Sequence, residues 1–197
     1  MRETSSGVVL WLNPITDPPA KVTPGHFRLM QKDKSFSPHL LVVPLGSSVD
    51  FPNMDPFYHN VFSQFDGKRF DLGLYEAGSV KTVRFDHEGI SYIFCNIHPQ
   101  MSAVVIALAT PYVAGSSDSG KILLPNVSVG TYELHLWAEG VDTQQLNALS
   151  RRVQVGLPET SLGIITLTKA DTIPPHKNKF GEDYKPDAST EYGPNVP

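Results

Sequence analysis

Residues 94–101 read FCNIHPQM and contain the only cysteine of the 197-residue chain. His98 follows Cys95 by three positions, and Met101 follows His98 by three. The residues before the cysteine alternate between apolar and polar side chains, and the residues after the methionine form an apolar run; both patterns are typical of β-strands. The stretch is therefore predicted to be a loop that joins two strands.

A single cysteine excludes an internal disulfide framework. It is either a small buried hydrophobic residue or a ligand or nucleophile. The presence of just one cysteine, taken by itself, favours the first interpretation. The neighbouring His98 and Met101 reverse that preference, because His59, 36 positions before the cysteine, completes the ligand set of a type 1 copper site. Thiolate suits Cu(I), imidazole suits both oxidation states, and a thioether is a weak axial ligand. We therefore predict one copper bound by His59, Cys95, His98 and Met101.

Other residues are expected to hold these ligands in place without touching the metal themselves. Asn60 follows the upstream histidine and is expected to hydrogen-bond across to the Cys95 loop, while Pro99 stiffens that loop and removes an N–H group. An apolar rim is expected to keep water from the metal around an exposed edge of His98. Its predicted members are Met54, Phe57, Tyr58, Phe62 and Ile97.

The composition limits the fold and the partners. With 40% hydrophobic residues, 15 glycines and 17 prolines, the chain favours short strands and many turns, and it is long enough for one or two small domains. The net charge of −4 makes nucleic acid an unexpected partner. No run approaches the roughly 20 apolar residues of a membrane span.

The periodicity predicts an all-β chain. A Pro-rich linker is expected over residues 15–25, and residues 64–78 are expected to be irregular. Strands are predicted at 7–12, 26–31, 39–43, 48–52, 59–63, 80–85, 90–95, 102–109, 121–124, 131–137, 151–155 and 163–168, with one short helix at 141–149.

The order His-Asn, then Cys-x2-His-Pro-x-Met after a Tyr-x-Phe strand, resembles the cupredoxins, with a short loop most similar to that of amicyanin. The resemblance covers roughly residues 26–110, and we assign residues 20–110 to this domain. It implies a Greek-key β-sandwich, one type 1 copper and one-electron transfer. The same four residues, each matched in place, are the ligands that it implies.

The flanking segments have no counterpart in a single-domain cupredoxin. Residues 118–137 resemble a carboxypeptidase-regulatory or transthyretin-like β-sandwich, whose first strand is expected at 7–16. We therefore predict a second, smaller β-sandwich built from residues 7–16 and 111–170, with the copper domain inserted into it. The alternative is an N-terminal strand that pairs with the cupredoxin. Residues 171–197 are polar and Pro-rich, and are predicted to be an extended or disordered tail.

Two functions fit these features. The first is a carrier of single electrons between periplasmic redox partners, such as a cytochrome c or a periplasmic dehydrogenase. The second is a copper-binding docking module that binds a partner through the second β-sandwich and has no fast electron-transfer role. A copper enzyme is not expected, because the remaining histidines do not form the clustered pairs that further copper sites need. The polar start shows no signal peptide, which fits a cytoplasmic protein or a mature exported one; the resemblance favours a periplasmic or extracytoplasmic location.

Overall fold

The computed structural model describes residues 7–15, 21–64, 67–170 and 176–184. Apart from one short helix, the regular structure of these residues is β, which confirms the predicted all-β class. No helix in the described residues is long and apolar enough to cross a membrane. The elements in chain order are β1 (Val8–Pro14), β2 (His26–Arg28), β3 (Met30–Lys32), β4 (Ser35–Ser37), β5 (Leu40–Pro44), β6 (Ser48–Pro52), β7 (His59–Ser63), β8 (Phe70–Tyr75), β9 (Val80–Arg84), β10 (Gly89–Phe94), β11 (Ser102–Leu108), β12 (Val113–Gly115), β13 (Gly130–Ala138), α1 (Thr143–Leu149) and β14 (Arg151–Val155).

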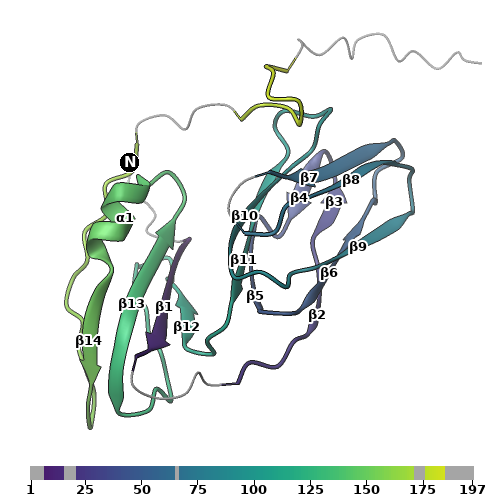
Figure 1. Ribbon diagram of the computed structural model, residues 1–197. Coiled ribbons are helices and arrows are strands. Elements are labelled where there is room, and N and C mark those ends of the chain that lie inside the picture. The colour runs from purple at the N-terminus through teal and green to yellow at the C-terminus, as the bar shows by residue number, and fades with distance from the viewer. Residues whose placement is uncertain (1–6, 16–20, 65–66, 171–175, 185–197) are drawn as a thin grey trace, which may run out of the picture.

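Residues 26–108 form a β-sandwich (Figure 1). One sheet has the strand order β5-β11-β10-β7-β8, and the other has the order β2-β6-β9. The short hairpin β3-β4 adds to the second side of this core, since β3 also contacts β6. The two layers enclose one hydrophobic cluster that includes Phe51, Val61, Phe85 and Ile93. Cys95 and Met101 belong to the same cluster, so the predicted metal ligands lie at the end of a packed core.

A separate four-stranded sheet has the order β12-β1-β13-β14. Its first strand precedes the sandwich in the sequence and its other strands follow it. The pairing of β1 with β13 runs from Val8 opposite Ala138 to Pro14 opposite Tyr132. The sheet thus joins the two segments that the sequence assigns to a second domain. The carboxypeptidase-regulatory resemblance of that domain stays a prediction.

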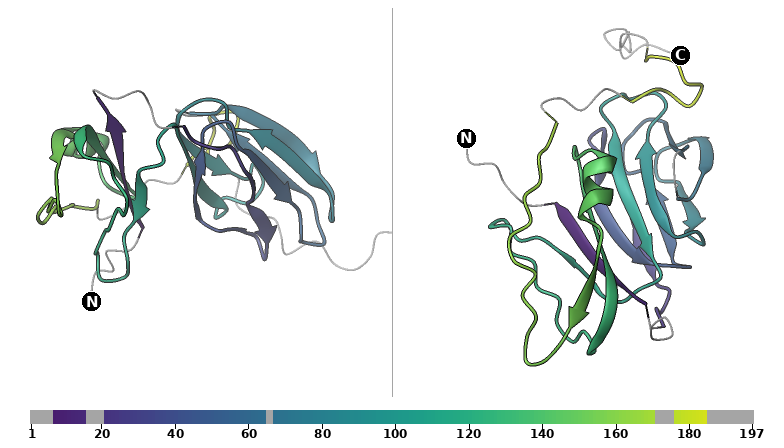
Figure 2. Two further views of the ribbon diagram at one scale, coloured as in Figure 1. Left: turned by 90° about the horizontal axis from the view of Figure 1, so that it is seen from below. Right: turned by 60° about the vertical axis from the view of Figure 1, so that its left-hand side comes forward.

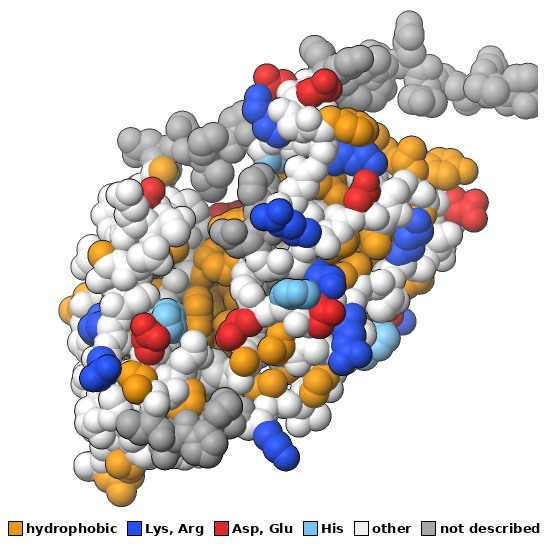
Figure 3. All heavy atoms as spheres, viewed as in Figure 1, with side chains coloured by type: hydrophobic (Ala, Val, Ile, Leu, Met, Phe, Trp, Pro, Cys, Tyr) orange, Lys and Arg blue, Asp and Glu red, His pale blue; other side chains and the backbone are white. Residues whose placement is uncertain are grey.

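The second sheet packs on the outer face of the five-stranded sheet. Strand β11 shows this by alternation: Val105 lies in the first core, whereas Val104 and Ile106 lie in the second. Trp137 of β13 donates its indole N–H to the hydroxyl of Tyr92 on β10 at 3.3 Å. The views in Figure 2 place the second sheet beside the sandwich, and Figure 3 shows hydrophobic side chains along a furrow between the two parts. Strands β5, β10 and β11 of the five-stranded sheet are therefore covered on both faces.

Several predicted elements differ from the structure. Residues 64–78 were expected to be irregular, but they contain β8, whose pairing with β7 shifts register between Asn60 and Phe62. Residues 121–124 and 163–168 were expected to be strands and have no regular structure. Parts of the linker and tail predictions, residues 16–20, 171–175 and 185–197, lie outside the described residues.

Candidate metal centre

Three elements bring the predicted ligands together. His59 is the first residue of β7, Cys95 directly follows β10, and His98 lies in the loop between β10 and β11. Strands β7 and β10 are hydrogen-bonded neighbours in one sheet, which sets the upstream histidine beside the cysteine. His59, Cys95 and His98 form the one cluster of potential metal-ligating His, Cys, Asp or Glu side chains found among the described residues.

The distances within this cluster fit a single small metal ion. Cys95 Sγ lies 3.7 Å from His59 Nδ1 and 3.6 Å from His98 Nδ1, and the two Nδ1 atoms are 3.1 Å apart. Bonds of about 2.3 Å to sulfur and about 2.0 Å to nitrogen, roughly 120° apart, would separate sulfur from nitrogen by roughly 3.7 Å. The three donor atoms therefore already surround a point where one ion fits, and a thiolate with two imidazoles is the trigonal set of a type 1 copper site.

The surroundings of Cys95 act on the pKa of its thiol in two opposite directions. Cys95 is fully buried, and burial raises the pKa of its thiol. Backbone groups of Asn60, Ile97 and His98 act in the opposite direction, because their hydrogen bonds favour the thiolate. A bound metal cation would add a much larger effect of the same sign and deprotonate the sulfur.

Met101 closes the loop beside the cysteine. Its backbone N–H donates to the His98 carbonyl at 3.0 Å, and the Cys95 N–H donates to the Met101 carbonyl at 3.3 Å. The Met101 side chain is completely buried in the same core as Cys95. The role of its thioether as the weak axial ligand stays a prediction.

Asp55 is a residue of the site that the sequence analysis missed. Its carboxylate accepts a hydrogen bond from His59 Nε2 at 2.8 Å, and both side chains are buried. This bond leaves Nδ1 of His59 free of that proton and directed at the cluster, in the manner of a carboxylate–histidine–metal triad. Burial opposes the charged form of Asp55, but hydrogen bonds from His59 and from two backbone N–H groups prevail and lower its pKa. The sequence signal that could have identified Asp55 is its position, four residues before a predicted ligand.

Asn60 and Pro99, the two residues predicted to support the ligands, have different surroundings. The Asn60 side chain donates to Asp71 Oδ1 on β8 at 2.7 Å, not to the Cys95 loop, because the carboxylate is the stronger acceptor. The backbone of Asn60, and not its side chain, makes the hydrogen bond to Cys95. Pro99 lies in a turn at the surface, and its carbonyl accepts a hydrogen bond from His176 Nε2 at 2.7 Å.

Four of the five predicted rim residues lie at the surface near the cluster. Met54, Tyr58 and Ile97 are 59%, 57% and 42% exposed. The half-buried Phe57 ring lies 5.2 Å from the His59 ring and 5.6 Å from the His98 ring. Phe62 differs: it is buried and packs against Phe94. We call Met54, Phe57, Tyr58 and Ile97 the apolar rim.

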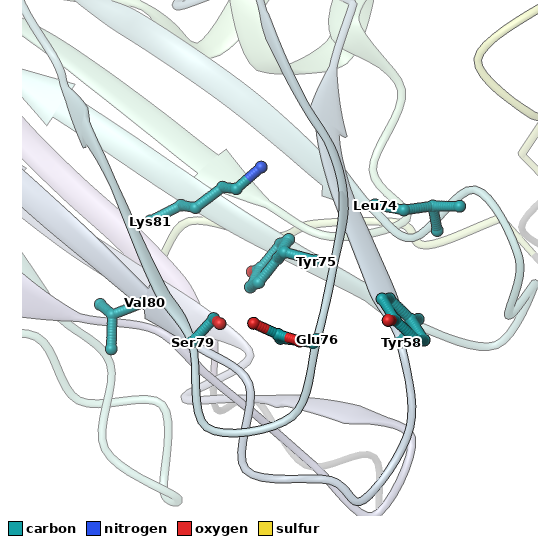
Figure 4. A pocket seen from close by; sticks show the side chains of 7 residues that line it. All are labelled: Tyr58, Leu74, Tyr75, Glu76, Ser79, Val80 and Lys81. Carbon is teal, nitrogen blue, oxygen red and sulfur yellow. The ribbon is translucent and has the colours of Figure 1, made fainter.

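A shallow hollow of about 410 Å³ begins beside Tyr58 (Figure 4). Leu74 and Val80 are exposed apolar side chains on its wall, and Glu76 and Lys81 are the charged ones. Lys81 Nζ lies 5.1 Å from the centre of the Tyr75 ring. The apolar surface near the cluster thus extends from the rim onto β8 and β9.

The other histidines were predicted to lie apart from any metal site. His26, His39 and His87 make ion-pair contacts with Asp50, Glu139 and Asp86 respectively, and His135 stacks on Trp11. His176 is different. It lies against the Cys95–Met101 loop, where its ring stacks on Phe94 with the ring centres 4.0 Å apart.

No protein-family model matches the chain, and no curated protein matches it. Solved structures show partial likeness. A copper-containing nitrite reductase from Thermus scotoductus SA-01 is 21% identical with a TM-score of 0.41, over 49% of this chain and 25% of that chain. A purple cupredoxin from Nitrosopumilus maritimus is 24% identical with a TM-score of 0.37, over 41% of this chain and 98% of the other.

A variant of amicyanin in the Cu(I) form is 17% identical with a TM-score of 0.40, over 50% of this chain and 98% of the amicyanin chain. Likeness at this level assigns no function. The sulfur and two nitrogen atoms of Cys95, His59 and His98 are the independent evidence for a metal site.

Proposed function

We propose that this protein is a type 1 copper protein of the cupredoxin kind that transfers single electrons between redox partners. The observation that carries the proposal is the cluster of Cys95 Sγ, His59 Nδ1 and His98 Nδ1, with separations of 3.1–3.7 Å that fit one trigonally bound ion. Copper would supply the one-electron redox couple.

The residues of the chain supply rigidity and seclusion. His59 is fixed by Asp55, and Cys95 is fixed by its strand and by the backbone bonds that close the loop. Both residues are fully buried, so water is excluded from their side of the site. Ligands that keep one arrangement in both oxidation states lower the reorganisation that electron transfer requires. Only His98 among the four predicted ligands is half-exposed, which makes its edge the route for an electron.

The apolar rim supports a carrier over a storage site. Exposed Tyr58 and Ile97 directly precede the predicted ligands His59 and His98, where a partner can bring its own redox centre close to His98. Exposed Met54 directly precedes Asp55, which binds His59. Exposed apolar patches of this kind mark interaction surfaces. A cytochrome c or a periplasmic dehydrogenase is the proposed class of partner, in a periplasmic or other extracytoplasmic setting. No enzymatic turnover is proposed.

Copper loading tests the site directly. The purified protein is titrated with Cu(II), and the visible spectrum and electron paramagnetic resonance are recorded before and after a reductant is added. We expect one equivalent of copper, an intense thiolate-to-copper absorption band and loss of that band on reduction. Cys95→Ser should abolish the band. His87→Asn, which changes an exposed histidine paired with Asp86, should leave it intact.

Stoichiometric loading without the intense band, with Cys95 still reduced, would contradict the type 1 assignment. Rapid mixing of the reduced protein with an oxidised cytochrome c then tests the carrier role. Fast exchange that slows when Ile97 is changed to Glu would support docking at the rim. A normal copper band with no electron exchange would favour the copper-binding docking module instead.

A further inference from the structure

The described part of the C-terminal segment, residues 176–184, lies against the Cys95–Met101 loop. Figures 1 and 2 show this segment, in yellow, at the end of the molecule where β10 passes into β11. It is separated from the loop by more than 70 residues in the sequence, and it follows the strands of the second sheet. A polar tail without apolar periodicity gives no reason to expect this position.

Hydrogen bonds join the segment to three residues of the loop. The Tyr184 hydroxyl donates to the Cys95 carbonyl at 2.7 Å, and His176 Nε2 donates to the Pro99 carbonyl at 2.7 Å. The backbone N–H of Lys179 donates to Asn96 Oδ1 at 2.9 Å. The segment therefore satisfies polar groups on both sides of the predicted ligand His98.

Two further contacts fix the segment in this position. The His176 ring stacks on Phe94, the last residue of β10, with an angle of 23° between the ring planes. Lys179 Nζ pairs with Asp71 at 2.8 Å, and Asp71 also accepts the hydrogen bond from Asn60. The segment is thereby connected to both strands that carry a buried ligand, β7 through Asn60 and β10 through Phe94.

We propose that Tyr184 is a positioning residue of the metal centre: its hydroxyl, held in place by residues 176–184, fixes the Cys95 carbonyl and with it the loop that carries the thiolate and His98. The residue touches no reacting atom and acts through the backbone of a ligand. The positive end of its O–H dipole is directed at Cys95, so it also favours the reduced state of a bound metal.

The first test uses the metal-free full-length protein, so it does not depend on copper binding. Amide hydrogen exchange is measured by NMR for Cys95 and Met101, whose N–H groups close the loop. Tyr184→Phe removes only the hydroxyl and should make both amides exchange about fivefold faster, the factor that one net hydrogen bond corresponds to. Tyr112→Phe is the matched control, because its hydroxyl contacts only Ser128 Oγ among the described partners, at 3.4 Å in the second sheet region.

The second test rests on the proposed function and uses the copper-loaded protein. Tyr184→Phe should lower the affinity ratio of Cu(I) to Cu(II) about threefold, which is a decrease of about 28 mV in reduction potential at 59 mV per factor of ten. The ligand set is unchanged, so the intense visible band should persist. His176→Ala, which removes the ring and the bond to Pro99, should act in the same direction.

Unchanged exchange in both variants would overturn the proposal, because residues 176–184 would then not hold the loop. Faster exchange with an unchanged potential would also overturn it, because the tether would not reach the metal. Failure of the wild-type protein to bind copper would instead refute the proposed function, and the exchange measurement would still decide whether Tyr184 positions the loop.

Discussion

Asp55 offers the sharpest test of how this fold holds its predicted copper ligand. The carboxylate is 5% exposed and accepts three hydrogen bonds: from His59 Nε2 at 2.8 Å, from the Asp33 N–H at 2.7 Å and from the Lys34 N–H at 3.0 Å. Asp33 and Lys34 form the turn of the hairpin β3-β4, and both have positive φ, at 54° and 52°. Turns with positive φ at two successive residues normally use Asn and Gly, so this backbone conformation is unfavourable for Asp33 and Lys34. The hydrogen bonds from their N–H groups to Asp55 offset part of that free energy.

Replacement of Asp55 by Ala removes all three bonds and leaves the buried Nε2–H of His59, and two part-buried backbone N–H groups, without this acceptor. Hydrogen bonds to charged groups contribute about 1.5–3 kcal/mol each. The three contributions are not additive, so we expect about 3–5 kcal/mol less stability in total. Asp55→Asn keeps one acceptor oxygen and should lose about 1.5–3 kcal/mol.

The assay is urea unfolding of the copper-free protein, followed by far-UV circular dichroism. Tryptophan fluorescence is less suitable, because Trp11 and Trp137 both lie in the second sheet. Asp86→Ala is the control, since Asp86 makes exposed ion pairs and its loss should leave the unfolding midpoint nearly unchanged. Asp55→Asn should also weaken copper binding about 10–100-fold. A loss of less than about 1 kcal/mol in Asp55→Ala would refute the reasoning.

Three further predictions concern stability of the copper-free protein, measured in the same way. Gly67→Ala should destabilise the fold more than Gly73→Ala, although both glycines have positive φ. A Cβ at Gly67 would lie 2.7 Å from Ser91 Oγ on β10, whereas a Cβ at Gly73 meets nothing within 4 Å. Ile106→Ala should cost about 2–5 kcal/mol, because the side chain is fully buried between the two parts of the molecule. The pKa values of Asp55 and Asp71 are lowered from 3.8, so their contribution should be complete above that pH and disappear as the pH falls below it; equal urea midpoints at about pH 5 and about pH 2 would contradict this.

The cluster of His59, Cys95 and His98 could be predicted because its information is local and chemical. Three of the four predicted ligands lie within seven residues of one loop, and each is of a type that few other roles explain in that order. His59 required only the further step that its strand lie beside the cysteine, which the pairing of β7 with β10 provides. Asp55 lies only four positions before His59, but an aspartate in a Pro-containing loop is common for reasons unrelated to a metal site.

Strands were predictable where apolar and polar side chains alternate. They were less predictable where strand formation depends on the presence of a partner strand. Strand β8 contains Asp71 and Gly73, which favour turns, but Gly73 adopts φ of 65° inside the strand and so accommodates its irregular pairing. Residues 163–168 have the β-branched composition of a strand and no regular partner in the described structure. The contacts of Tyr184 depend on long-range polar groups, for which sequence periodicity carries no signal.

The position of the second sheet gives a physical reason for attaching it to the sandwich that carries the predicted copper site. The loop that carries Cys95 and His98 leaves β10 and enters β11, and both strands are covered on both faces. In β11, Val105 is packed inside the sandwich while Val104 and Ile106 are packed against the second cluster, so the strand cannot shift without disturbing two close-packed cores. Without the second sheet, the outer faces of β5, β10 and β11 would lie in water. Here those faces are buried, and the same chain continues to residues 176–184, which contact the loop itself. The second sheet thus packs against the strands that flank the loop of predicted ligands, and residues 176–184 bind the loop directly, which is the arrangement that the proposed positioning role of Tyr184 requires.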